Sequence, residues 1–170
     1  MRTVSRAKFL TGLACLLSAI AISMALVVAA HAEPGLQSDL TAVSGQGSGH
    51  VDVSPTADDQ HDTIFTAQGT AEVHDALADT TYVVQRAVDF TPGDGVCTIA
   101  PSPPAGWISL TTFTTSPAGA GAGHFERMTR PVGPQGFQFD IVFRVVKLND
   151  NGTLDLSQVL MSACMTATVK

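Results

Sequence analysis

The most regular alternation of apolar and polar residues lies between positions 137 and 146. Phe137, Phe139, Ile141, Phe143 and Val145 share one parity, and this period of two is typical of a strand with one buried face. A strand this apolar needs a second layer to cover it. The segment therefore predicts the central strand of the domain.

The other face of this predicted strand carries Asp140 and Arg144. Four residues separate them, which is too far for an assured salt bridge within one strand, so we expect each to pair with a neighbouring strand. If the face is solvated, it is outer surface. If it is covered, it is where a partner would dock.

Shorter segments rich in Thr and Val, separated by Gly and Pro, predict further strands. They lie at residues 50–54, 63–66, 69–74, 80–90, 96–99, 107–115, 124–128 and 159–170. The buried face changes within 107–115, which predicts a bulge near Thr111. Asn151-Gly152 predicts a tight turn after the central strand, and Arg86 interrupts the apolar face of 80–90, so it should lie at the rim or be paired.

Seven to eight of these segments, counted as short strands without a helical period, predict an all-β fold. The architecture expected is a two-layer antiparallel β-sandwich of immunoglobulin-like type, formed by residues 50–170 as one domain. Residues 33–49 contain few large apolar side chains and end in Ser44-Gly45-Gln46-Gly47-Ser48-Gly49. This composition predicts a flexible linker.

Residues 1–32 have the organisation of a signal peptide. Arg2, Arg6 and Lys8 precede an uncharged apolar run, and Ala30-His31-Ala32 fits the small-residue cleavage rule. Cleavage would leave a secreted or extracytoplasmic chain that begins at Glu33. The minority alternative is an uncleaved N-terminal anchor, because the run is about long enough to span a bilayer.

Loss of residues 1–32 changes both the charge and the cysteine count. Three of the nine basic residues leave and all fifteen acidic residues remain, which gives a net charge of −9. Such a balance argues against nucleic acid and against stable association with anionic membranes. Cys97 and Cys164 are the cysteines that remain, and an even count in an exported chain predicts one disulfide.

The sequence offers no convincing catalytic or metal-binding motif. His50, His61, His74 and His124 follow Ala32, but none forms a close ligand pair such as HxH or HxxxH. The segment 149–152 lacks the acidic residues of a calcium loop, and no serine has the GxSxG context of a hydrolase nucleophile. We therefore assign no catalytic residue, metal ligand or cofactor.

The hairpin-like segments 69–74, 80–89 and 110–125 resemble those of small secreted bacterial β-sandwich proteins, mostly uncharacterised, and faintly those of CHRD-type domains. The resemblance covers about residues 68–168 and implies a fold and a compartment. The chain lacks the His-x-His pattern often seen in CHRD-type domains, so the resemblance implies no activity.

These observations favour a secreted, non-enzymatic β-sandwich domain with a binding or structural role. The expected partner is an unidentified protein or a surface glycan. The alternatives are a small secreted hydrolase or hydrolase inhibitor, and a metal-binding protein that uses the histidines.

Overall fold

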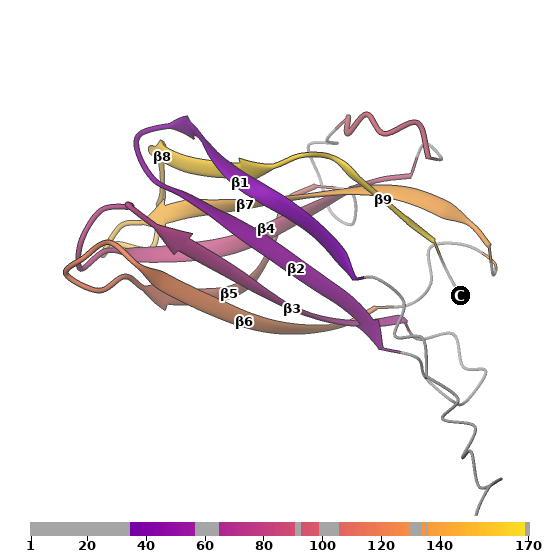
Figure 1. The fold of residues 1–170 in the computed structure, drawn as a ribbon, viewed down its shortest axis with the longest axis horizontal. Helices are drawn as coiled ribbons and strands as arrows, with labels where there is room; N and C mark the ends of the chain where they lie inside the picture. Colours follow the sequence, from indigo (N-terminus) through magenta and orange to yellow (C-terminus); the bar gives the residue numbers. More distant parts are fainter. Residues whose placement is uncertain are drawn as a thin grey trace, which may run out of the picture. The chain divides into compact units, whose positions relative to one another are not determined.

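The structure, a computed structural model, describes residues 35–56, 65–90, 93–98, 106–129, 134 and 136–168. These residues form nine strands and no helix (Figure 1). The strands are β1 (Leu36–Ser44), β2 (Ser48–Thr56), β3 (Phe65–His74), β4 (Thr81–Asp89), β5 (Ile108–Thr114), β6 (Gly121–Thr129), β7 (Gln138–Leu148), β8 (Leu154–Ser162) and β9 (Met165–Thr168). The prediction of an all-β fold is confirmed.

The strands form one continuous antiparallel ladder in the order β5-β4-β7-β8-β1-β2-β3-β6, and β9 pairs with β7. The two end strands, β5 and β6, follow each other in the chain and contact each other. The sheet thus curls almost into a barrel (Figure 1). It is not clearly divided into the two layers of the predicted immunoglobulin-like sandwich, because the ladder continues from β7 through β8 and β1 to β2.

β7 is an inner strand, as the sequence predicts, and pairs with β4, β8 and β9. Its apolar parity enters the main core together with residues from most of the other strands. The fully buried members of that core include Tyr82 and Val84 from β4, Phe143 and Val145 from β7, and Leu160 from β8. Both β4 and β7 are also largely buried on their outer faces.

Glycines on the inner faces of β3 and β6 make space for two aromatic rings. A Cβ at Gly69 would overlap the ring of Phe125, and a Cβ at Gly123 would lie 2.8 Å from Cδ1 of Phe113. Glycine in a strand often marks such a close approach. Gly121 and Gly123 belong to β6 and help β5 and β6 come together.

The prediction that residues 33–49 form a flexible linker is wrong for the described part of that segment. β1 lies there, between β2 and β8, and β2 begins at Ser48. Leu40 is the fully buried residue of β1, whereas most of the others are exposed. Backbone pairing on both sides, rather than a hydrophobic pattern of its own, thus holds this polar segment in the sheet.

Two other predicted strands differ in the structure. The predicted closing strand 159–170 is split between β8 and β9, and the inward parity changes from Leu160 to Met165 across the break. Residues 96–98 form no strand. In contrast, the predicted segments 63–66 and 69–74 join into one strand, β3, as far as residues from Phe65 onward are described.

Two local predictions are confirmed. The β4–β5 register shifts so that Leu110 has no partner, which is the expected bulge beside Thr111. The turn after β7 closes with a hydrogen bond from the Gly152 N–H to the Asn149 carbonyl of 2.8 Å, and Gly152 has a φ of 79°. The predicted signal segment 1–32 lies outside the described residues, and within those described no helix has the length and apolar character needed to cross a membrane.

Candidate functional site

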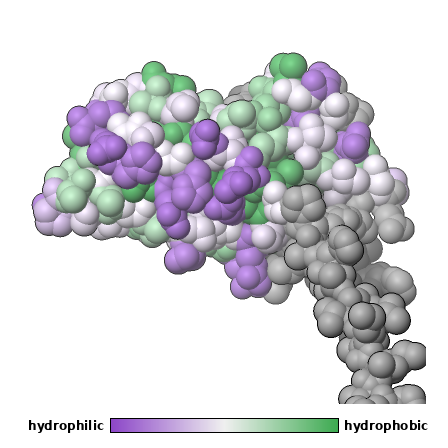
Figure 2. All heavy atoms as spheres, in the orientation of Figure 1, coloured by the Kyte–Doolittle hydropathy of each residue, from purple (hydrophilic) through white to green (hydrophobic). Residues whose placement is uncertain are grey.

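The outer faces of β2, β3 and β6 carry a grid of polar side chains. Strand alternation turns Ala71 and Val73 of β3 into the core and the residues of the opposite parity, such as Gln68, Thr70 and Glu72, outward. Cross-strand pairing then forms two neighbouring rows on the outer face: Asp52, Thr70 and His124 in one, and Ser54, Gln68 and Glu126 in the other. Figure 2 shows hydrophilic residues gathered over this face.

These two rows line a groove of about 490 Å³, to which Gly69 and Phe125 also contribute. The volume lies within the usual range for small-ligand sites. The groove is open to solvent, and Gln68, His124 and Glu126 are exposed. It is therefore a shallow binding surface on a regular sheet.

Hydrogen bonds hold several of these side chains in place. Thr70 Oγ1 lies 2.8 Å from His124 Nδ1. His50, beside the groove, lies with Nε2 3.2 Å from Asp52 Oδ2 and 3.8 Å from Glu72 Oε2. The groove thus offers carboxylates, an amide, hydroxyls and an imidazole, which together can accept and donate hydrogen bonds.

The three histidines in the described residues, His50, His74 and His124, lie on this outer face, whereas His61 is outside the described part of the chain. Within the described ranges, no group of three or more histidine, cysteine, aspartate or glutamate side chains is arranged to hold a metal ion. His50 contacts two carboxylates through the same ring nitrogen, Nε2, and His124 forms a hydrogen bond with a threonine hydroxyl. The geometry gives the metal hypothesis no support.

Ser48, His74 and Asp75 lie together at one end of β2 and β3. Ser48 Oγ is 3.1 Å from His74 Nδ1 and 3.5 Å from Nε2, while Asp75 Oδ2 is 3.0 Å from the same Nδ1. A hydrolytic triad needs the hydroxyl on one ring nitrogen and the carboxylate on the other. Here both partners crowd one nitrogen, and the Asp75 side chain is 84% exposed, so the cluster resembles a surface hydrogen-bond group rather than an active site.

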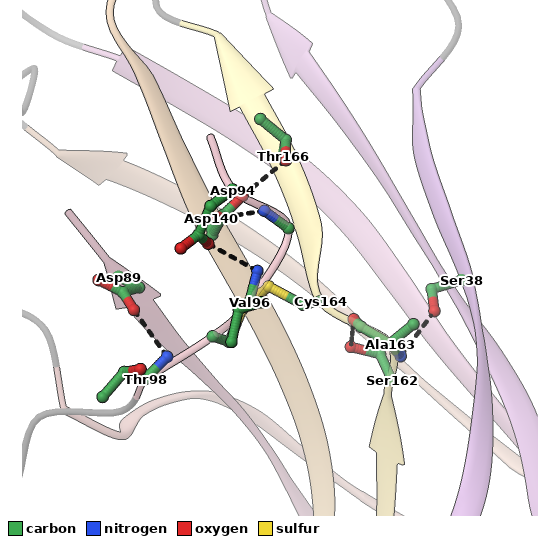
Figure 3. The surroundings of a disulfide bond; sticks show 12 residues. Ser38, Asp89, Asp94, Val96, Thr98, Asp140, Ser162, Ala163, Cys164 and Thr166 are labelled. Atoms are coloured by element: carbon green, nitrogen blue, oxygen red, sulfur yellow. Dashed lines mark hydrogen bonds between the residues drawn. A yellow bond between two sulfur atoms is a disulfide. The ribbon is translucent and has the colours of Figure 1, made fainter. Parts of the chain in front are cut away.

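Cys97 and Cys164 form the predicted disulfide, with a Cα–Cα distance of 5.6 Å. It ties the segment 93–98 to the junction between β8 and β9 (Figure 3). At that junction the Ala163 N–H donates to Ser38 Oγ at 3.0 Å, and Phe143 N–H donates to Ser162 Oγ at 2.9 Å. The break that the sequence did not predict is therefore where the chain bends to bring Cys164 to Cys97.

The same segment covers one end of the polar face of β7. Asp140 is fully buried there, and its carboxylate accepts hydrogen bonds from the Gly95 N–H at 3.1 Å and from Thr166 Oγ1 at 2.6 Å (Figure 3). The Thr98 N–H donates to Asp89 Oδ2 at 2.6 Å. This end of the face, which the sequence left open as a docking surface, is covered by the chain's own backbone.

Arg86, singled out as a charge within an apolar parity, is buried and makes an interaction. It does not share a face with Glu72 and His74, which are exposed on the outside of β3. Arg86 therefore does not share a cleft with Glu72 and His74.

Sequence reasoning missed the groove. Ser54, Gln68, Thr70 and Glu126 carry no motif, and they meet because β3 lies between β2 and β6. The segment 69–74 was predicted as a strand, but neither its partner strands nor their register could be inferred from spacing alone. No protein-family model matches the chain. A search of curated proteins likewise finds no relative, so the interpretation of the groove depends on its own geometry.

Proposed function

We propose that the chain is an exported, non-enzymatic binding domain that holds a neutral glycan in the groove on β2, β3 and β6. The groove itself carries the proposal, because its lining is made of side chains that pair with hydroxyl groups. Carboxylates and the Gln68 carbonyl accept hydrogen bonds from sugar hydroxyls, and the Gln68 amino group donates to them.

The charge of the groove favours a neutral ligand over an anionic one. Asp52 and Glu126 lie in the lining and Glu72 beside it, whereas none of the described residues that line the groove is Lys or Arg. An anionic glycan would be repelled by these carboxylates. The shallow, solvent-open shape suits one or two sugar units of a surface polymer rather than an enclosed small molecule.

Two features support the proposal that the protein is exported. The first 32 residues have signal-peptide organisation, and the Cys97–Cys164 disulfide is compatible with an oxidising compartment outside the cytoplasm. Intact-mass analysis of the protein recovered from outside the cytoplasm should give a chain that begins at Glu33. A chain that retains residues 1–32 there would support the uncleaved anchor instead.

Binding is tested by screening the purified protein against neutral oligosaccharides and measuring the affinity of the best ligand by calorimetry. Gln68→Ala removes one donor and one acceptor from the groove and should weaken binding by about tenfold. Gln37→Ala is the matched control, because Gln37 is also exposed on a strand, β1, but does not line the groove. Equal effects of the two substitutions, or no neutral glycan that binds, would overturn the proposal.

A further inference from the structure

A second polar row crosses β5, β4 and β7, on strands that contribute nothing to the groove. Ser109, Gln85 and Arg144 are successive cross-strand partners. The buried Gln85 donates from Nε2 to Ser109 Oγ at 3.0 Å and accepts at Oε1 from Arg144 Nε at 2.8 Å. The serine therefore fixes the orientation of the amide, and the amide fixes the arginine.

Trp107 holds the guanidinium of Arg144 from a second direction. The Cζ atom of Arg144 lies 3.9 Å from the centroid of the Trp107 ring, which is a cation–π contact. The indole contacts the guanidinium at Cζ, and the bond to Gln85 uses the Nε–H. The guanidinium is thus pre-organised, so less side-chain entropy is lost when it binds a ligand.

The end of the guanidinium remains open. The described residues contain no buried side-chain nitrogen or oxygen without a hydrogen-bond partner, so the terminal amino groups of Arg144 that make no bond are accessible to solvent. With Nε occupied, these two amino groups form the edge that can donate two parallel hydrogen bonds.

Arg144 also lacks a counter-charge, because no carboxylate among the described residues forms an ion pair within 4 Å of its guanidinium. Partial burial lowers the pKa of Arg144 below its ordinary value, because the charge has lost part of its hydration. The nearest acidic residue on the same face of β7, Asp140, is already bonded to Gly95 and Thr166. A partly desolvated cation without an anion partner favours an anionic ligand.

We propose that Arg144, positioned by Gln85 and Trp107, is a binding site for a carboxylate, supplied either by a free organic acid or by an acidic peptide. The planar carboxylate matches the open edge of the guanidinium and can lie in its plane, beside the stacked indole. A tetrahedral anion such as phosphate would also direct oxygens out of that plane, toward the ring. This site is independent of the proposed glycan groove, and its failure would leave that proposal unchanged.

Trp107 provides a direct readout, because it is the chain's single tryptophan. The purified protein is titrated with sodium acetate against sodium chloride at constant ionic strength, and the fluorescence of Trp107 is followed. Saturable quenching or a spectral shift is expected, with a dissociation constant on the order of millimolar, since a single partly exposed ion pair is weak. No saturable change, or tighter binding of phosphate than of acetate, would overturn the proposal.

Three variants test whether the change in Trp107 fluorescence arises from binding at Arg144. Arg144→Gln should abolish it, and Lys147→Gln, which removes the cation paired with Asp155, should leave it unchanged. Gln85→Glu places a carboxylate against Arg144 within the chain, so it should also abolish the response even if Arg144→Gln fails to fold. A response that persists in folded Gln85→Glu would contradict the site.

The source of the carboxylate is distinguished by two blocked dipeptides, one with two glutamates and one with two glutamines. If the glutamate peptide binds at least about tenfold more tightly than acetate, the site takes acidic peptides. If the peptide binds no better than acetate, the site takes free organic acids. Binding of the glutamine peptide as tight as that of the glutamate peptide would overturn the assignment of a carboxylate.

Discussion

Asp89 on β4 and Asp140 on β7 are direct partners in the antiparallel ladder, and both accept backbone N–H groups from the segment 93–98. Like charges at opposed positions in a sheet are normally unfavourable. Here the segment that crosses them provides the hydrogen bonds, and the disulfide at Cys97 ties the same segment to the β8–β9 junction. The two carboxylates therefore fasten an irregular segment to the sheet, and neither is assigned a catalytic role.

Asp140→Asn should destabilise the protein by about 1–3 kcal/mol. Both carboxylate oxygens of Asp140 accept hydrogen bonds. An amide keeps one accepting oxygen for the Gly95 N–H and must donate to the Thr166 hydroxyl, so two charge-assisted bonds are replaced by two weaker neutral ones. Urea unfolding measures the loss, and faster hydrogen exchange at the Gly95 amide would locate it. Asp150→Asn, at an exposed position after β7, is the control, and an equal effect of both substitutions would contradict the role given to Asp140.

Cys97→Ser should lower the melting temperature under oxidising conditions. The disulfide joins residues 67 positions apart, and closing a loop of that length stabilises the folded state by about 4 kcal/mol in the chain-entropy model. Reductant should bring the wild type down to the variant and leave the variant unchanged. Two free thiols in intact-mass analysis of the exported protein would contradict the disulfide.

The sequence predicted the elements better than their arrangement. Residues 137–146 and 80–90 carry strong apolar alternation, and both became inner strands with the predicted buried parity. β1 could not be predicted, because Leu40 is the fully buried residue in it and its stability comes from strands far away in the chain. The alternation of apolar and polar residues indicates which face of a strand is buried, whereas the strands that pair with it depend on the whole fold.

The same limit applies to the sites. Asp140 and Arg144 were correctly expected to pair across strands, but their partners, Thr166, Gly95 and Gln85, lie 26, 45 and 59 residues away. The contact of Trp107 with Arg144 could not be predicted, because it depends on the strand β4 between β5 and β7. Gly121 and Gly123 likewise reveal nothing in the sequence of the ring of Phe113 that lies against them.

Gly69→Ala should destabilise the protein by about 1–3 kcal/mol through overpacking. The added methyl group would overlap the ring of Phe125 and lie 2.7 Å from the Asp52 carbonyl oxygen. Urea unfolding of the single variants and of the double variant with Phe125→Leu forms a mutant cycle. Gly69→Ala should cost less in the Phe125→Leu background, because the smaller side chain can move away, and strict additivity would show that the ring is not the obstacle.

Ser157→Ala should raise the pKa of Asp155. The hydroxyl and backbone N–H of Ser157 donate to Asp155 Oδ1 at 2.6 and 3.0 Å, Lys147 donates to Oδ2 at 3.1 Å, and together they lower the pKa of Asp155 from 3.8 to about 2. Because these bonds favour the charged form, Asp155 stabilises the fold fully above pH 3.8. That contribution is lost as the pH falls through 3.8 toward about 2.

The measurement is a carboxyl-carbon NMR titration of Asp155 in the wild type and in Ser157→Ala, accompanied by urea unfolding at several pH values. The substitution removes the hydroxyl, the largest cause of the shift, so the variant should titrate closer to 3.8 and gain less stability between pH 2 and 4. Lys147→Gln should give a smaller rise in the pKa of Asp155, because the hydrogen bond from Lys147 and its charge each lower that pKa less than the serine hydroxyl does. A wild-type Asp155 that titrates near 3.8, or a larger effect of Lys147→Gln, would show that the serine bonds do not hold the carboxylate in solution.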